Sequence, residues 1–156
     1  PDQDVVVFVG DGSYLLSNSD IYSSVFYGQK LIIIVCDNGG HMVINRLQLA
    51  KGGKEYICNL RAARATNLHF VDFENHAKSM GANAEKVSST SELEAAFKRA
   101  KASDKTYVIS VKTHGYEWLE GTAFWESPTL QDPITEDNKK ALDDFETGKN
   151  KQRRGV

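Results

Sequence analysis

Runs of apolar residues alternate with amphipathic segments along this chain, and the alternation predicts strands and helices in turn. Two runs near the start, Val5–Val9 and Leu31–Cys36, are apolar throughout and rich in β-branched residues. Unbroken runs of this kind are typical of parallel strands that are covered on both faces of a sheet. The segment between them is long enough for one helix, which we expect to begin at Ser17 or Asn18 and to end at Gly28.

The rest of the chain continues the alternation. A short helix is expected over His41–Leu49 and a long loop over Ala50–Asn67. The residues of this helix expected to face inward are Met42, Val43, Ile44 and Leu47. Beyond the loop the pattern predicts a helix over Asp72–Met80, a short strand over Glu85–Ser88, a helix after a capping box at Ser89–Glu92, a strand over Thr106–Val111, a charged helix over Glu136–Phe145 and a disordered basic tail over Lys149–Arg154.

This order of elements predicts an α/β fold. A strand–helix–strand unit of this length implies a right-handed crossover between parallel strands. We therefore expect an open, doubly wound parallel sheet with helices on both faces. Residues 1–114 are expected to form its core, and residues 115–156, where aromatic residues give way to prolines, a C-terminal extension.

Composition and charge narrow the functional classes. The chain has 156 residues, of which 26% are charged, and a formal net charge of −2, which gives no electrostatic support for binding nucleic acid or an acidic membrane. No apolar run approaches the ~20 residues of a membrane span. The two cysteines, Cys36 and Cys58, stand 58 − 36 = 22 positions apart. This argues against a disulfide framework or a zinc site and agrees with a cytoplasmic protein.

Two polar, glycine-containing motifs follow the first two strands: GDG at Gly10–Gly12 and DNGG at Asp37–Gly40. Because parallel strands end at the same edge of a sheet, where open α/β folds bind ligands, we expect Asp11 and Asn38 to be neighbours. A carboxylate, an amide oxygen and a backbone carbonyl near Gly40 are the hard oxygen donors that hold Mg²⁺ together with a phosphorylated ligand.

The alternative is that both motifs are ordinary turns, since Asp, Asn and Gly dominate turns in general. By average residue frequencies, a GDG alone is expected in roughly 4% of chains of this length, and an Asn at one fixed offset lowers this to about 0.2%. The strand before each motif lowers it further, which favours a binding site.

The two motifs and their spacing resemble those of thiamine-diphosphate-dependent enzymes, and the resemblance runs from Asp4 to about His114. It implies the fold of their diphosphate-binding (PP) domain, with thiamine diphosphate and Mg²⁺ as cofactors. In that family the GDG aspartate, the distal asparagine and a main-chain oxygen two residues later hold the metal, which implies metal ligands at Asp11, Asn38 and Gly40. The cofactor contacts implied for this chain come from Gly10, Asp11, Gly12, Ser13, Asn38, Gly40, His41 and Met42.

Within the family, four stretches are most similar to the trihydroxycyclohexane-1,2-dione hydrolases of inositol catabolism, a group also named probable malonic semialdehyde oxidative decarboxylase. The stretches are GDGSYLLSNSDIYSSV from Gly10, INRLQ at Ile44–Gln48, VDF at Val71–Phe73 and THGYE at Thr113–Glu117. The resemblance implies an enzyme that makes or breaks C–C bonds next to a carbonyl. Inside the family, an acetolactate-synthase-like enzyme or another 2-oxo acid decarboxylase or carboligase is the alternative.

The resemblance also implies partners. Enzymes of this family combine a pyrimidine-binding (PYR) domain, a middle domain and the PP domain. The glutamate that activates the cofactor comes from the PYR domain of a second subunit, in a homodimer or homotetramer. Because this chain resembles the PP domain alone, we expect a fragment of a larger chain that is inactive by itself. It then holds no catalytic residue, although His41 and His114 could face a substrate.

Two classes outside the family stay open. A Rossmann dinucleotide binder needs G-x-G-x-x-G, but Leu15 stands where the third glycine belongs. A non-catalytic α/β binding module is the other. A P-loop is excluded because the chain has no GK[ST] sequence.

Overall fold

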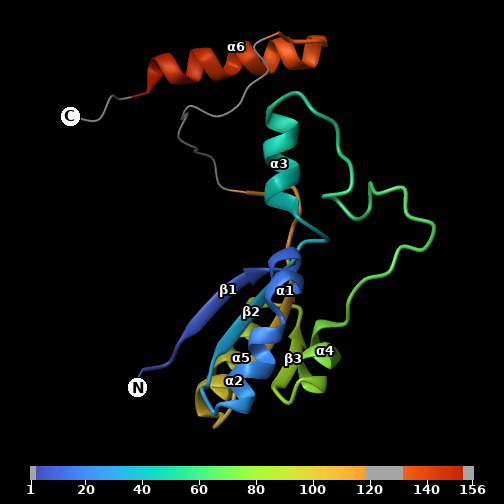
Figure 1. The fold of residues 1–156 in the computed structure, drawn as a ribbon. Coiled ribbons are helices and arrows are strands. Elements are labelled where there is room, and N and C mark those ends of the chain that lie inside the picture. The colour runs from blue at the N-terminus through green and yellow to red at the C-terminus, as the bar shows by residue number, and fades with distance from the viewer. Residues whose placement is uncertain (1–2, 119–131, 153–156) are drawn as a thin grey trace. The chain divides into compact units, whose positions relative to one another are not determined.

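A computed structural model describes residues 3–118 and 132–152 of the chain (Figure 1). These residues divide into two compact units, the first from the start to His41 and from Ala65 to Gly115, the second from Met42 to Arg64 and from Tyr116 onward. The elements are β1 (Val6–Gly10), α1 (Asp11–Ser17), α2 (Ser19–Phe26), β2 (Ile32–Asp37), α3 (Met42–Ala50), α4 (Phe73–Ser79), β3 (Asn83–Val87), α5 (Thr90–Ala102), β4 (Tyr107–Lys112) and α6 (Glu136–Lys151). The sequence-based division placed residues 42–64 with the core, whereas here they group with the C-terminal residues.

The first unit is built on a four-stranded sheet in the order β1-β2-β4-β3, and every pair is parallel. The chain moves across the sheet in one direction from β1 to β2 to β3 and then reverses to reach β4. Right-handed crossovers place helices on one face while the chain moves in one direction and on the other face once it reverses. Helices α1, α2 and α4 therefore share one face and α5 covers the other (Figure 1). This confirms the expected doubly wound α/β fold.

The alternation of side chains along β2 divides the core into two clusters, one on each face of the sheet. Ile33 and Val35 pack with α1, α2 and α4, where Tyr14 and Phe73 meet edge to face at 5.1 Å between ring centroids. Ile32 points the other way and packs with α5. Because both faces of β2 are buried, the prediction from its unbroken apolar run is confirmed.

The same prediction for the first strand is wrong. β1 is an edge strand that pairs only with β2 among the described residues, and Phe8 is 69% exposed. Val6 and Phe8 lie opposite Ile32 and Ile34, on the face that α5 covers further along the sheet. An apolar run does not reveal a strand's place in the sheet, so it cannot distinguish a central strand from an edge strand.

The first helix also begins earlier than expected. Gly10 caps it in an extended conformation, with φ −72° and ψ 155°, and Asp11 is already its first residue. The helical segment is interrupted at Asn18, whose side-chain amide donates to the Leu15 carbonyl at 2.8 Å, and resumes as α2. The end at Gly28 is confirmed, because this residue has φ +64°, a conformation that favours glycine.

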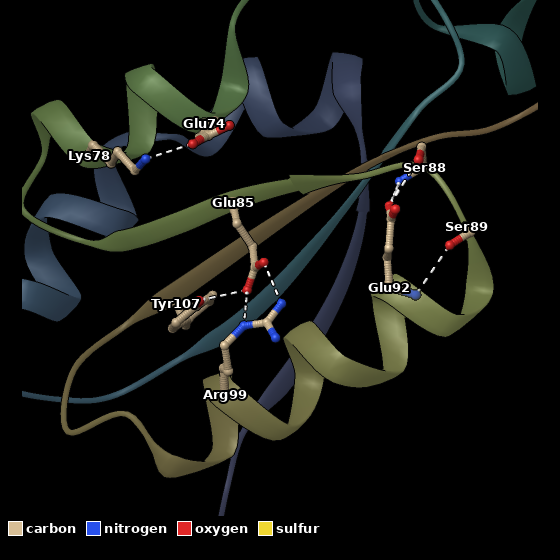
Figure 2. A network of polar contacts seen from close by, with 8 residues as sticks. All are labelled: Glu74, Lys78, Glu85, Ser88, Ser89, Glu92, Arg99 and Tyr107. Atoms are coloured by element: carbon tan, nitrogen blue, oxygen red, sulfur yellow. Dashed lines mark hydrogen bonds and ion pairs between the residues drawn. The ribbon is translucent and has the colours of Figure 1, made fainter.

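Helices α4 and α5 follow their predicted bounds closely, and each has a side-chain cap at its amino end. Asp72 accepts from the Asn75 N–H, and the Ser89 hydroxyl accepts from the Glu92 N–H at 3.2 Å. The other half of the expected capping box differs, since the Glu92 carboxylate accepts from the Ser88 N–H instead of that of Ser89 (Figure 2). The caps therefore account for where both helices begin.

An ion pair fastens α5 to the sheet. The guanidinium of Arg99 makes two bonds with Glu85 on β3, at 3.0 and 2.6 Å, and the Tyr107 hydroxyl of β4 donates to the same carboxylate (Figure 2). These hydrogen bonds hold the pKa of Glu85 below its ordinary value, the Arg99 contact contributing most.

Helix α3 presents a different face from the one expected. Met42 is buried as predicted, but Val43, Ile44 and Leu47 are 69%, 51% and 42% exposed, so that part of the prediction is wrong. The second buried residue of α3 is polar. Asn45 is fully buried, and its side chain belongs to a hydrogen-bonded cluster described below. The long segment after α3 contains no helix, as expected.

The last helix is longer than expected. α6 runs from Glu136 to Lys151, so the expectation of a disordered tail is wrong for residues 149–151, whereas Arg153 and Arg154 lie outside the described residues. Phe124, Trp125 and Pro128 of the expected C-terminal extension also lie outside them. Among the helices of the described segments, none is long and apolar enough to cross a membrane.

Candidate functional site

The two glycine-containing motifs meet through one carboxylate at the carboxyl edge of the sheet. Asp11 is 4% exposed, and its Oδ2 accepts hydrogen bonds from the backbone N–H groups of Gly39 and Gly40, at 3.0 and 2.6 Å. The parallel register sets Gly10 opposite Cys36, so both strands end at the same level. The expectation that the motifs come together is met by this contact.

The glycines of the second motif allow their amides to turn toward Asp11. Gly39 and Gly40 have φ of 93° and 137°, a region that side-chain-bearing residues rarely adopt. Both residues are buried. The sequence Gly-Gly at this position is therefore explained by the need to present two consecutive N–H groups to a carboxylate.

The electrostatic state of Asp11 favours a bound cation. Burial raises the pKa of its carboxyl group above the ordinary value of 3.8, the Gly40 N–H opposes this, and the negative charge of Asp37 raises the pKa again. The burial of Cys36 and the negative charge of Asp11 raise the pKa of the Cys36 thiol. Since ionisation of Asp11 is disfavoured by its surroundings, a cation beside it would stabilise the charged form.

The other oxygen donors of the expected metal site lie in the same loop. Asn38 is half-buried between Asp37 and Gly39, and Gly40 belongs to the same loop, whose backbone N–H groups contact Asp11. The described residues contain no group of three or more His, Cys, Asp or Glu side chains that could hold a metal. The oxygen donors that this loop and Asp11 offer are one carboxylate, one amide and backbone carbonyls, and an all-oxygen set of this kind is the type that Mg²⁺ prefers together with ligand phosphates.

Gly12 and His41 approach each other closely at this site. A Cβ atom built on Gly12 would lie 2.5 Å from His41 Nδ1 and 2.6 Å from Cε1. Any side chain at position 12 would therefore displace the imidazole ring. Ser13, the next residue of α1, is exposed and carries its hydroxyl on the first turn.

The remaining residues predicted for the site are placed as follows. Met42 is the buried first residue of α3, in the second unit. His114 is exposed just beyond β4, after Thr113, whose N–H donates to the Asp37 carbonyl at 3.0 Å. Their contacts with a cofactor or substrate stay predictions.

Sequence reasoning missed a polar cluster in the second unit. Glu55 Oε1 accepts from Asn45 at 2.8 Å, from Asn59 at 3.2 Å and from the Tyr116 hydroxyl at 2.8 Å. Asn59 is 2% exposed, and the hydrogen bond from Asn45 is the first cause of a lowered pKa at Glu55. No local sequence motif predicts this cluster, because its residues come from a helix, a loop and the segment after β4, which are far apart in the sequence. It anchors the loop after α3.

The first 111 residues match the family model described as "Thiamine pyrophosphate enzyme, C-terminal TPP binding domain". Among curated proteins, the chain is 36% identical over 123 residues to the 3D-(3,5/4)-trihydroxycyclohexane-1,2-dione hydrolase of Halalkalibacterium halodurans, covering 75% of this chain and 19% of that protein. It is 31% identical over 154 residues to the protein of the same name from Lacticaseibacillus casei, covering 95% and 23%. The chain thus spans about a fifth of the length of these relatives.

Solved structures give the same result. The structure titled thiamine diphosphate-dependent 4-hydroxybenzoylformate decarboxylase from Rhodococcus jostii RHA1 has a TM-score of 0.60 and 25% identity to this chain, covering 73% of it and 20% of that protein. A putative thiamin diphosphate-dependent enzyme from Mycobacterium smegmatis gives 0.55 and 25%, covering 72% and 18%. Together with the family match, which covers well over half of the chain, these likenesses show that the chain belongs to the thiamine pyrophosphate enzymes, as their C-terminal cofactor-binding domain.

Proposed function

We propose that this chain binds the diphosphate of thiamine diphosphate through Mg²⁺, with Asp11, Asn38 and the Gly40 carbonyl as metal ligands. The observation that carries the proposal is the buried Asp11 carboxylate, which receives two N–H groups from the loop containing the other two donors. A buried, polar junction of two strand ends is where open α/β folds bind ligands.

Each residue then has a definite task. The amides of Gly39 and Gly40 fix the orientation of the Asp11 carboxylate, so its second oxygen has a defined direction toward a cation. Gly12 leaves the space that the His41 ring occupies and keeps the backbone near the diphosphate free of side chains. Ser13 offers a hydroxyl and a backbone N–H to the phosphate oxygens. When bound, thiamine diphosphate supplies the electron sink for making or breaking a C–C bond next to a carbonyl.

We infer that the whole enzyme is a C–C hydrolase of the trihydroxycyclohexanedione type, acting in inositol catabolism in the cytoplasm. The support is the identity of 31–36% to proteins of that name, against 25% to the decarboxylase structure. A 2-oxo acid decarboxylase or carboligase is the second candidate, favoured by the decarboxylase name of that structural neighbour. A malonic semialdehyde decarboxylase activity belongs with this second candidate.

Turnover is expected to need a PYR domain from a second subunit, in a homodimer or homotetramer. The chain covers only about a fifth of its relatives, and Asp11 and Asn38 bind a cofactor without supplying an acid or base to it. We therefore expect no catalytic turnover from these 156 residues. A measurable C–C hydrolase, decarboxylase or carboligase rate from this chain would overturn that part of the proposal.

The binding proposal is tested by calorimetry with thiamine diphosphate, with and without Mg²⁺. Wild-type protein should bind only when the metal is present, and Asp11→Ala and Asn38→Ala should each weaken binding by about tenfold or more, because each removes one metal ligand. Asp20→Asn, a change at an exposed acid on α2, is the matched control and should bind as wild type does. Binding that ignores Mg²⁺, or stabilisation by NAD without metal, would favour a dinucleotide binder instead.

A further inference from the structure

The outer edge of β1 is open in the part of the chain that the structure describes. This strand pairs with β2 on one side and lies at the end of the sheet (Figure 1). Val5, Val6, Val7 and Phe8 are all exposed, and the run from Val5 to Gly10 contains no charged residue. An open apolar strand of this kind is a template for pairing with another strand.

The opposite edge of the same sheet is protected by charge. β3 carries Glu85 and Lys86 side by side, and Glu85 is held by the two-bond ion pair with Arg99 on α5 (Figure 2). Charged side chains on an edge strand discourage pairing with another chain. Of the two edges of the described sheet, β1 is therefore the one suited to accept a further strand.

The hydrogen bonds to β2 determine which backbone groups of β1 face outward. The Val5 carbonyl accepts from the Ile32 N–H at 2.9 Å, so the backbone groups of Val5 face β2. Backbone groups alternate in direction along a strand, and those of Val7 therefore face β2 as well. The N–H and C=O groups of Val6 and Phe8 face the open edge, which presents two donors and two acceptors there.

This arrangement of donors and acceptors is complementary to itself. In an antiparallel pair with a two-fold axis at Val7, Val6 of one copy lies opposite Phe8 of the other, and the two residues present their backbone groups to each other. The same contact is repeated on the other side of the axis. Each Phe8 ring then meets the Val6 side chain of the second copy on the same face of the sheet, and aromatic and β-branched pairs of this kind stabilise antiparallel strands.

We propose that two copies of this chain associate through β1, as an antiparallel pair centred on Val7 that joins the two sheets into one. The charged residue next to the strand, Asp4, already pairs with Lys30 at 3.1 Å, so no unpaired charge enters the contact. The interface is one short strand wide, and association should therefore be weak and depend on concentration. The proposal goes beyond the proposed function, since the pairing residues Val6, Val7 and Phe8 are not assigned to the metal or the cofactor.

Disulfide crosslinking tests the register of the pair. The two copies of position 7 would form a non-hydrogen-bonded pair with Cα atoms about 4.5 Å apart, which is within the range of a disulfide. Val7→Cys should therefore give a crosslinked dimer in mild oxidant at least about tenfold faster than Val5→Cys, whose two copies would lie roughly 13 Å apart along the strands. Wild-type protein, which retains Cys36 and Cys58, gives the background, and peptide mapping identifies the crosslinked positions.

Hydrogen exchange of the wild-type chain tests the same pairing without a substitution. When the protein concentration rises from roughly 10 µM to 1 mM, the protection of the Val6 and Phe8 amides should increase at least about threefold. Protection of the Val7 amide, which faces β2, should change little. The proposal is overturned if Val5→Cys crosslinks as fast as Val7→Cys, or if exchange at Val6 and Phe8 does not depend on concentration.

Discussion

Asp11 combines burial with a proposed function, metal binding, that requires charge, and its effect on stability should therefore depend on pH and on metal. Burial, the largest cause, raises its pKa in the folded state above the ordinary 3.8. For such a group, the stabilisation is fully present below the ordinary pKa and is lost as the pH rises through the raised folded-state pKa. Without metal, the ionised carboxylate thus lowers the stability of the protein at neutral pH.

We predict that Asp11→Asn melts at the same temperature as wild type or higher at pH 7 without Mg²⁺, and loses this advantage near pH 4. The asparagine oxygen can still accept from Gly39 and Gly40 without carrying a charge. Thermal melts at both pH values measure this, with Asp20→Asn as the control. A wild-type protein that is clearly the more stable of the two at pH 7 in the absence of Mg²⁺ would contradict the prediction.

Gly12 provides a second prediction at the residue scale. Gly12→Ala should weaken binding of thiamine diphosphate with Mg²⁺ by about tenfold, because the new methyl group meets the His41 ring at 2.5 Å and pushes it away. Calorimetry on the double variant Gly12→Ala/His41→Ala identifies the cause. Recovered binding shows that the clash with the imidazole is responsible, whereas a persistent loss shows that the methyl group itself blocks the diphosphate.

At the scale of single elements, the amino end of α5 rests on one hydroxyl. Ser89→Ala removes the acceptor of the Glu92 N–H and should lower the free energy of unfolding by about 1 kcal/mol. Lys98→Ala, at an exposed position further along the same helix, keeps that acceptor and should change stability by less than about 0.5 kcal/mol. Urea unfolding of both variants measures the difference. Equal losses in the free energy of unfolding would show that the Ser89 cap does not stabilise the helix.

The loop after α3 is an element without regular structure, and Glu55 gives it a pH dependence. The hydrogen bond from Asn45 is the first cause of the lowered pKa of Glu55, followed by those from Tyr116 and Asn59. Its stabilising contribution is present above the ordinary value of 4.5 and is lost as the pH falls through the lowered pKa. The protection of amides in residues 51–64 against hydrogen exchange, corrected for the intrinsic exchange rate at each pH, should therefore fall at pH 3 to 4, and Glu55→Gln should show the lower protection already at pH 7. Glu94→Gln, at an exposed position on α5, should leave exchange in the loop unchanged.

Elements were predictable from the sequence where local signals determine them, and less so where distant residues do. The end of α2 at Gly28 and the caps at Asp72 and Ser89 follow from residues next to each other in the chain. The inward face of α3 does not, because Asn45 is buried by its bond to Glu55 and not by its own hydropathy. The pairing of Lys86 with Ser110 could not be read from the sequence for the same reason: these residues are neighbours only through the strand register.

At the scale of the whole molecule, the alternation of strands and helices predicts the fold class, but it does not predict which strand lies at the edge of the sheet. Two strand ends at one edge were enough to predict the meeting of Asp11 with the Asp37–Gly40 loop, because any parallel crossover brings them together. The position of β1 at the edge could not be deduced, since both β1 and the central β2 come from unbroken runs of apolar, mostly β-branched residues. The site was thus more predictable than the exposure of the strand that carries it.

The exposed edge at β1 leads to a prediction about the 156-residue chain in solution. An apolar edge strand is a template for pairing with another chain, and Val5, Val6 and Phe8 are 49%, 38% and 69% exposed. Phe8→Lys should reduce concentration-dependent self-association while changing the free energy of unfolding by less than about 0.5 kcal/mol, because the side chain is largely outside the core. Phe26→Lys, at a 70% exposed position on α2, is the control that leaves the edge intact. Sedimentation equilibrium that shows the same loss of association for both variants would assign the effect to general surface hydrophobicity, whereas a loss confined to Phe8→Lys assigns it to the open strand.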